Sequence, residues 1–300
     1  MSRFDAIDLS ALPPPQVVTE LDFEDILAEM KAATIAAAPE MEPVLDLEGE
    51  PALKILQVCA FYVMLARAEK NDDARAVMLA FARGSDLDHL GALFGVARAV
   101  INEGDPGANP PVPPTLEEDA RLRERIQLAL EGFSTAGPIG AYKFHALGAS
   151  SDVHDVAITS PAPGEVRVTI LATYGDGEPD QALLDTVEET LNADDVRPLT
   201  DLVIVQAATI VPYTVEAELD VKHGPDASLV LAEAEEAVVA YVEKQRRLGA
   251  PIARSGLFAA LHREGVRSVD LTEPASDIEI EPTEVGHCTE ITVTVAGPEE

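Results

Sequence analysis

The chain has 300 residues, with 54 acidic against 21 basic side chains and a formal net charge of −33. Such a chain has little with which to neutralise phosphates, which excludes sequence-independent nucleic-acid binding as its function. The charge favours partners with basic surfaces, and adaptation to high salt would produce the same excess. Apolar residues make up 47% of the chain but aromatic residues only 4%, so Val, Leu, Ile and Ala must build its cores.

The two cysteines and the N-terminal sequence indicate the cellular compartment in which the protein is made. Cys59 and Cys288 lie far apart and make no disulfide framework, which indicates synthesis in a reducing cytosol. The first fifteen residues lack the apolar core of a signal peptide. Nor does any stretch reach about eighteen uncharged apolar residues. We expect neither secretion through a signal peptide nor membrane insertion.

The N-terminal third reads as an arm followed by helices. Residues 1–21 carry three consecutive prolines and no periodicity, which predicts an extended arm, either frayed or docked on a neighbour. Asp22 is a suitable N-cap for a helix to about residue 38. Pro51 suits the first turn of a second helix, since no Gly or Pro interrupts residues 52–82. At 1.5 Å per residue, that helix would span roughly 45 Å, longer than one compact core of this chain needs.

Apolar residues occupy two sides of this long helix. One side carries Leu53, Leu56, Ala60 and Val63, and the other carries Ile55, Val58, Cys59, Tyr62, Leu65 and Ala66. Either the helix packs locally against residues 23–38, or other chains cover it in a mixed helical bundle without a strict heptad. We favour the bundle. The residues that we expect at its interface are Leu53, Leu56, Phe61, Tyr62 and Leu65.

Three further segments follow the long helix. Residues 85–95 predict a helix that begins at Ser85, with Leu87, Leu90, Leu93 and Phe94 facing inward. The Pro/Gly-rich stretch 102–115 predicts a loop, either a solvated linker, which we favour, or a hinge or covered surface. From Glu117 to Leu130, charged residues alternate while Leu122, Ile126, Ala129 and Leu130 recur at helical spacing. This pattern predicts an amphipathic helix with a solvated outer face.

A bend is expected after this helix. Gly137 and Gly140 admit positive φ, and Pro138 cannot continue a hydrogen-bonded ladder. We predict that Gly137, Pro138 and Gly140 form a structural bend, followed by a short helix over residues 142–147.

The remainder predicts two small α+β units. Residues 152–159 and 165–173 have the pattern of a β-hairpin, followed by a helix over 179–193 and a buried strand over 202–206, a β-β-α-β order. The second unit has a strand over 209–222, a helix over 228–247 and another over 255–264, capped by Ser255 and stopped by Gly265. Strands over 266–271 and 289–295 complete it, with acidic residues 277–284 between them. The residues after 296 should be loose.

The order of these pieces resembles the baseplate J-like family, the wedge proteins of contractile phage tails and related injection machines. The segments that carry the resemblance are Ser85–Arg98, Arg121–Ile126, Ser134–Tyr142, Val153–Ile158, Pro163–Leu171, Val196–Val205 and the block from Leu248 through Val269. Each is a weak pattern alone. Their order and spacing across about residues 20 to 275 make the match specific.

The resemblance implies a structural wedge component of a contractile tail or tail-like particle, with no reaction catalysed. Its expected partners are a second copy, another wedge protein (protein I-like), a sheath-initiator-like small protein and neighbouring wedges, in a six-fold ring around the central hub. Such wedges would pass the contraction trigger to the sheath. The expected location is the tail baseplate, assembled in the host bacterial cytoplasm.

No motif supports catalysis or a cofactor. Six histidines are scattered, and His287-Cys288 is one neighbouring pair where a zinc site needs three or four ligands. Phosphate-loop, dinucleotide and hydrolase-elbow motifs are missing from the sequence. Acidic groups near Asn71 and Asn192 lack a calcium-loop pattern. We therefore expect no cofactor and no metal. Two alternatives stay open: a tail-associated peptidoglycan hydrolase, disfavoured by the low aromatic content, and an acidic non-phage scaffold or binding module.

The predicted fold class is α+β: an N-terminal long-helix bundle region, a central helix and two small α+β units. The predicted divisions are an arm over 1–21, the helical region over 22–101, the loop and connecting helices over 102–149, and α+β units over 150–207 and 208–300.

Overall fold

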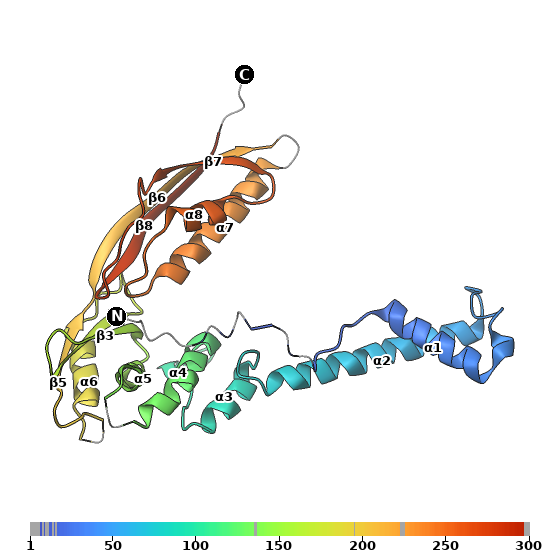
Figure 1. Cartoon of the computed structure of the whole chain (residues 1–300), viewed down its shortest axis with the longest axis horizontal. Helices are drawn as coiled ribbons and strands as arrows, with labels where there is room; N and C mark the ends of the chain where they lie inside the picture. The colour runs from blue at the N-terminus through green and yellow to red at the C-terminus, as the bar shows by residue number, and fades with distance from the viewer. Residues whose placement is uncertain are drawn as a thin grey trace. The chain divides into compact units, whose positions relative to one another are not determined.

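The computed structural model describes residues 7, 9, 12–13, 15, 17–134, 137–194, 196–222 and 226–296. The architecture is α+β, as predicted, and Figure 1 labels its elements. The chain divides into two compact units: a helical unit built from Asp5–Arg98 with Glu118–Ile126, and a second unit built mainly from Ala99–Glu117 and Gln127–Glu300. Most of the predicted arm, the end of the chain after residue 296, His223 and Asp195 lie outside the described residues.

In the helical unit, the first two helices begin where the sequence predicts. Asp22 caps α1 (Phe23–Ala37), because its carboxylate accepts hydrogen bonds from the backbone N–H groups of Glu24 and Asp25. A 3-10 turn, η2 (Pro39–Met41), follows. Pro51 occupies the first turn of α2 (Pro51–Ala76).

The predicted C-terminal end of α2 is wrong, since the helix stops at Ala76 and not near residue 82. The backbone carbonyls of Leu79 and Ala82 instead accept hydrogen bonds from the guanidinium group of Arg123, at 2.7 Å each. These carbonyls have left the helical ladder and need another donor. A distant arginine supplies it.

The next helix, α3 (Gly84–Ala92), begins one residue earlier than predicted. Leu87 is fully buried, as expected. Leu93 is 77% exposed, so its predicted inward position is wrong in this chain. The helix has already ended there, and the chain turns away through Gly95 at φ +72°.

The loop predicted over residues 102–115 is closed by strands that the sequence did not indicate. β1 (Val100–Asn102) pairs antiparallel with β2 (Thr115–Leu116), and Asp105 and Val112 form a further bridge. Glu117, buried beside them, accepts a hydrogen bond from the backbone N–H of Ala99 at 3.0 Å. The segment is therefore an ordered, closed loop.

The charged helix is α4 (Asp119–Gly132). The prediction of its apolar and solvated faces is wrong in part. Leu122 and Ile126 are buried as expected, but Leu130 is 65% exposed. The arginines do not form a simple solvated face. Besides the bonds of Arg123, Arg125 donates to the carbonyl of Ala97 at 3.2 Å. The carbonyls that accept these hydrogen bonds lie outside helices and strands and need a donor from elsewhere. A long guanidinium side chain can reach them, so these arginines point toward the protein and not into solvent.

The first α+β unit has the predicted β-β-α-β order. After α5 (Ile139–Ala149), which is longer than expected, the hairpin of β3 (Val153–Thr159) and β4 (Glu165–Ala172) is antiparallel. Next come α6 (Gln181–Leu191) and β5 (Leu202–Ala207), which runs parallel to β4 at the sheet edge. The predicted buried run in β5 is wrong: Val203 is buried, while Leu202 is 61% exposed. An edge strand of this sheet covers the core with one face only.

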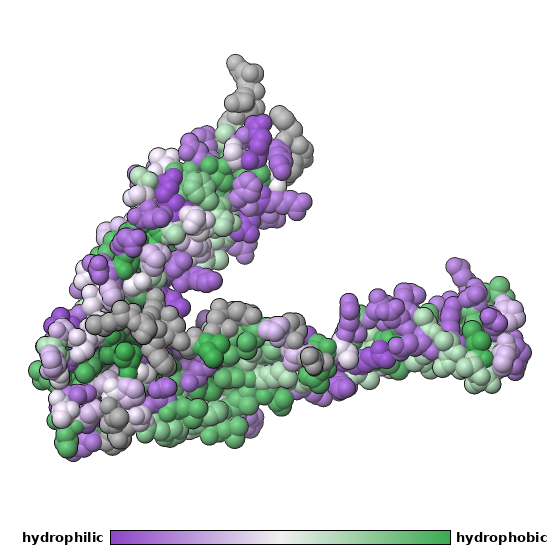
Figure 2. Space-filling model, in the orientation of Figure 1, coloured by the Kyte–Doolittle hydropathy of each residue, from purple (hydrophilic) through white to green (hydrophobic). Residues whose placement is uncertain are grey.

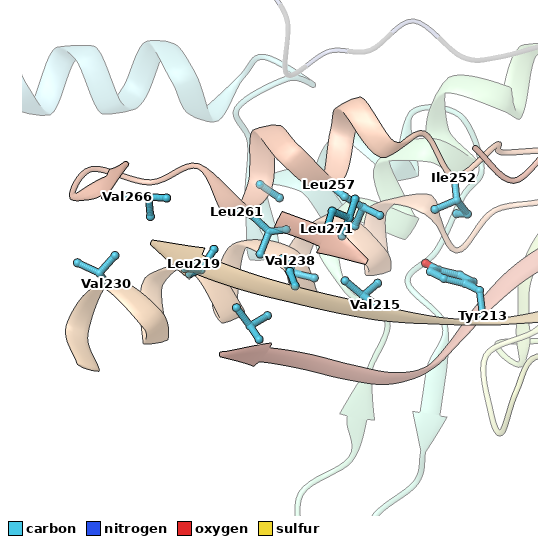
Figure 3. Close-up of a cluster of buried hydrophobic side chains, with 14 residues drawn as sticks. Tyr213, Val215, Leu219, Val230, Val238, Ile252, Leu257, Leu261, Val266 and Leu271 are labelled. Carbon is cyan, nitrogen blue, oxygen red and sulfur yellow. The ribbon is translucent and has the colours of Figure 1, made fainter. Parts of the chain in front are cut away.

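The second α+β unit has a three-stranded sheet in the order β7-β6-β8. Its central strand is β6 (Thr209–Val221), antiparallel to β7 (Val266–Glu273) and parallel to β8 (Glu284–Val295). Two helices, α7 (Ala227–Gln245) and α8 (Arg254–Leu261), pack against the sheet, and Figure 3 shows their shared core. β8 begins five residues before its predicted start, because its pairing with β6 starts at Glu284 opposite Thr209.

Ser255 is not the cap of α8, which corrects another prediction. The N-cap position belongs to Ala253 and has no side-chain hydrogen bond. The backbone N–H of Arg254 donates instead to the Asp277 carboxylate at 2.7 Å. A residue of the acidic stretch thus satisfies a free donor at the start of this helix.

Candidate assembly interface on the helical unit

One side of α2 is covered by α1. Leu53 and Ala60 are buried against Ile26 and Leu27 of α1, and Leu56 packs partly buried beside them. Exposed ion pairs flank this contact, Arg67–Glu29 and Lys31–Asp46, both at 3.2 Å. The two helices therefore form a local hairpin, which was one of the two interpretations of the sequence.

The other side of α2 remains exposed in this chain. Its large apolar residues are Ile55 (63% exposed), Val58 (56%), Tyr62 (66%) and Leu65 (46%). Their spacing of three and four residues places them on one stripe, which we call the α2 stripe. Phe61, beside it, is 46% exposed, and its ring meets that of Tyr62 edge-on at 6.0 Å. Figure 2 shows hydrophobic surface along α2 next to hydrophilic surface.

The α2 stripe is the kind of surface that a partner covers. A row of large apolar side chains on a helix is costly to leave in water and typical of binding surfaces. By length and composition alone, α2 is long and apolar enough to cross a membrane, and little of its apolar stretch is buried within this chain. Core helices of soluble proteins have the same length and composition.

The five residues predicted at the interface divide between the two sides. Leu53 and Leu56 pack against α1, whereas Phe61, Tyr62 and Leu65 are exposed. Ile55 and Val58 belong to the exposed stripe but were not among the predicted interface residues. The signal that separates the sides was present in the sequence, because residues 53, 56, 60 and 63 lie opposite residues 55, 58, 62 and 65.

A buried amide inside the helical unit was not recognised in the sequence. Asn71 of α2 is 3% exposed, and its side chain pairs with the backbone of Thr19 in two directions. The Nδ2 group donates to the Thr19 carbonyl at 2.8 Å, and Oδ1 accepts from the Thr19 N–H at 2.9 Å. This pairing fixes the described end of the predicted arm beside α2.

An ion-pair network joins α3 to the start of α4. Arg98 donates to Asp88 and to Asp119, both at 2.7 Å. Burial raises the pKa of Asp119, but hydrogen bonds from Arg98 and from the backbone of Gly84 outweigh it, and the net pKa is lowered. Asp119 is therefore held ionised and orients the start of α3.

The predicted bend lies in the other compact unit. Gly137 has φ +72°, and a Cβ there would meet Pro198 Cγ at 2.8 Å. Pro138 is the N-cap residue of α5. Gly140 lies in the first turn of α5, and a Cβ there would approach Glu131 Cγ to 2.7 Å. Gly140 therefore allows α5 to approach α4 closely, and it is not needed for a positive φ.

Potential ligand groups are dispersed. Among the residues that the structure describes, no group of three or more His, Cys, Asp or Glu side chains is placed to hold a metal ion. Cys288 lies half-buried in β8, where burial raises the pKa of its thiol.

Comparison with known proteins defines the class. The baseplate J-like N-terminal domain matches residues 48–105, the baseplate J-like central domain residues 134–207, and the baseplate J-like protein C-terminal domain residues 213–294. The chain is 43% identical over 299 residues to baseplate protein J of Escherichia phage P2, covering 98% of this chain and 99% of that protein. It is a component of a phage-like baseplate. Specifically, the chain belongs to the baseplate J-like family.

The chain is also similar to part of one solved structure. A chain in the cryo-EM structure of the anti-feeding prophage (AFP) baseplate, 6-fold symmetrised, is 13% identical with a TM-score of 0.42. The match covers 59% of this chain and 44% of that chain.

Proposed function

We propose that this chain is a structural, non-catalytic wedge subunit of a contractile tail baseplate. It assembles with a second copy and with another, protein I-like wedge protein, and meets a sheath-initiator-like small protein. Six such wedges close a ring around the hub and pass the contraction trigger to the sheath. Assembly takes place in the host bacterial cytoplasm. We also propose that the chain divides at residues 21, 101, 149 and 207 into the arm, the helical region, the loop with its connecting helices and the two α+β units.

The observation that carries this proposal is the α2 stripe. α1 already occupies the opposite side of α2, and the stripe is exposed within the described part of the chain, which supports packing by another chain. Burying one large apolar side chain contributes about 1.5–3 kcal/mol. Four such residues in one row supply a substantial driving force, of which association entropy consumes part.

The stripe is tested by Tyr62→Asp with Leu65→Asp. Leu56 is left intact because it packs against α1. The variant is co-expressed with the neighbouring wedge proteins, and co-purification through a tag on this chain is measured. We expect partner recovery to fall below about a tenth of the wild-type level, because two carboxylates would have to be buried at the interface.

The control is Leu229→Asp with Val239→Asp on α7, which introduces the same charge at exposed apolar positions of the other unit. It should leave recovery unchanged, and both variants should retain the wild-type circular dichroism spectrum. Normal recovery with the stripe variant would contradict the bundle.

A further inference from the structure

The exposed face of α2 carries opposite charges at its two ends. When the helical spacing of the α2 stripe is continued toward the N-terminal end of the helix, it reaches Lys54. Toward the C-terminal end it reaches Glu69 and Asp73, and all three side chains are exposed. Asp72 lies there too, in an exposed pair with Arg75 at 3.4 Å. A cation therefore precedes the apolar residues of this face, and carboxylates follow them.

The other charged residues of α2 lie off this face. Arg67 is on the side that α1 covers, where it pairs with Glu29 at 3.2 Å. Lys70 lies roughly 100° around the helix from the stripe. Glu50, the N-cap residue, accepts a hydrogen bond from the backbone of the first turn. A helix that lies on the stripe thus meets a lysine at one end and carboxylates at the other.

The spacing of the α2 stripe is the same in both directions. Its four residues are separated by three, four and three positions, so the midpoint of the stripe falls at residue 60. Two copies of α2 that run antiparallel with these midpoints aligned bring Ile55 of one copy opposite Leu65 of the other. Val58 then faces Tyr62. A two-fold axis relates the copies, so each contact occurs twice.

The charges favour this antiparallel direction over a parallel one. In the antiparallel pair, Lys54 of each copy lies within one helical turn of the position opposite Glu69 of the other copy. In a parallel pair, Lys54 would lie beside Lys54 and Glu69 beside Glu69, and like charges repel. Exposed ion pairs add little affinity, but unfavourable contacts of like charge select against the wrong orientation.

We propose that the α2 stripe pairs with the α2 stripe of a second copy, antiparallel, about a two-fold axis near residue 60. Each copy carries α1 on the far side of α2, so the pair forms a four-helix arrangement with both stripes inside. Phe61 lies to one side of the stripe, and the symmetry puts both Phe61 side chains on the same side of the pair. A helix of another wedge protein can pack there.

This inference rests on the proposed function, in which a second copy is one of the partners. It assigns that copy to the α2 stripe and fixes the direction in which it binds. Four large apolar side chains from each copy leave water in the pair, which supplies the driving force. The charges at the two ends supply the direction.

Cross-linking tests the direction. Cys59→Ala with Cys288→Ala gives a full chain without thiols, into which Ile55→Cys or Leu65→Cys is introduced. The two single-cysteine chains are co-expressed with different tags and treated with a short bismaleimide. Its reach is less than the roughly 15 Å that separate residues ten positions apart on a helix. We expect a cross-link between the two variants and none when either variant is treated alone.

Charge reversal tests the ends of the stripe. The dissociation constant of the pair is measured by sedimentation equilibrium of the full chain, at about 0.15 M salt, where charges beyond roughly 8 Å are screened. Lys54→Glu should weaken pairing roughly tenfold, because it places like charges together twice. Lys54→Glu with Glu69→Lys should restore it, since the reversed charges again meet opposite ones. The control, Lys70→Glu, makes the same change of charge off the stripe and should pair like the wild type.

Three results would overturn the inference: cross-links within each single-cysteine variant alone, no cross-link at all, or no rescue by the second reversal. If these occur while Tyr62→Asp with Leu65→Asp still abolishes partner recovery, the bundle stands with another protein on the stripe. Conversely, the expected cross-link together with normal partner recovery by that stripe variant would refute the bundle and retain the pairing of the two copies.

Discussion

Asp155 on β3 accepts a hydrogen bond from the backbone N–H of Leu248, 93 residues further along the chain, at 3.0 Å. The same carboxylate lies 3.5 Å from the Lys143 ammonium group, and both side chains are buried. Nearby, His154 Nε2 is 3.0 Å from the carbonyl of Arg246. An apolar cluster that includes Leu171 and Val285 continues the contact. The two α+β units are therefore joined by a polar and apolar junction and not only by the backbone.

Replacing Asp155 by Asn should strongly destabilise this junction. The substitution leaves Lys143 buried beside a neutral amide, and breaking a buried ion pair costs about 3–5 kcal/mol. We expect a large fall in the urea midpoint of the full chain, followed by far-UV circular dichroism. The control is Asp46→Asn, whose pair with Lys31 is exposed and contributes about 0–1 kcal/mol. Equal effects would show that Asp155 does not hold the junction.

Two buried tyrosines should respond in opposite ways to replacement by Phe. The Tyr142 hydroxyl donates to Asp201 at 2.8 Å, and its loss should cost about 0.5–1.5 kcal/mol and leave that carboxylate short of a donor. Tyr213 places its hydroxyl in the core shown in Figure 3, where the described residues offer it no partner. Burial raises the pKa of both phenols. Tyr213→Phe should be neutral or stabilising in thermal unfolding, and a larger loss than for Tyr142→Phe would contradict this.

Asn71→Ala should release the segment around Thr19. Both backbone groups of Thr19 lose their partner, at a cost of about 1–3 kcal/mol for the buried groups involved. Amide hydrogen exchange of Thr19, measured by mass spectrometry on peptides from this segment, should accelerate roughly ten- to hundredfold. Exchange in the peptides of α7 should not change. Unaltered protection at Thr19 would mean that the amide is not what fixes this segment.

Two glycines of α5 provide a matched pair of substitutions. Gly140→Ala would force a Cβ within 2.7 Å of Glu131 Cγ, so it should lower the unfolding midpoint. A Cβ at Gly148 would meet no atom within 4 Å, and Gly148→Ala should stabilise the protein by about 0.5–1 kcal/mol. If both substitutions stabilised the protein, Gly140 would not be required for the close contact between α4 and α5.

The bend itself has a separate test. Val at both Gly137 and Gly140 should impair wedge assembly, since Gly137 needs positive φ and Gly140 lacks space for a side chain. Unimpaired co-purification of the partners would show that assembly does not depend on this bend.

Much of the fold was readable from local patterns. Asp22 as a cap, the two apolar sides of α2 and the β-β-α-β order all arise from signals within a few residues. Two of the errors share one cause, which is a partner distant in sequence. Arg123 donates to a backbone carbonyl that follows the end of α2. Asp277, and not Ser255, accepts a hydrogen bond from the backbone at the start of α8.

The candidate site was only partly readable for the same reason. Helical periodicity separates the two sides of α2, but it does not tell which side α1 covers. Leu53 and Leu56 were therefore grouped with Tyr62 and Leu65, although they lie on opposite sides.

The proposal that the α2 stripe builds a bundle with other chains can be tested on the assembled complex. This chain is co-expressed with the neighbouring wedge proteins, and the products are separated by size-exclusion chromatography with light scattering. We predict a stable complex whose mass corresponds to two copies of this chain and one of another wedge protein. A monodisperse monomer that binds none of these proteins would contradict the bundle.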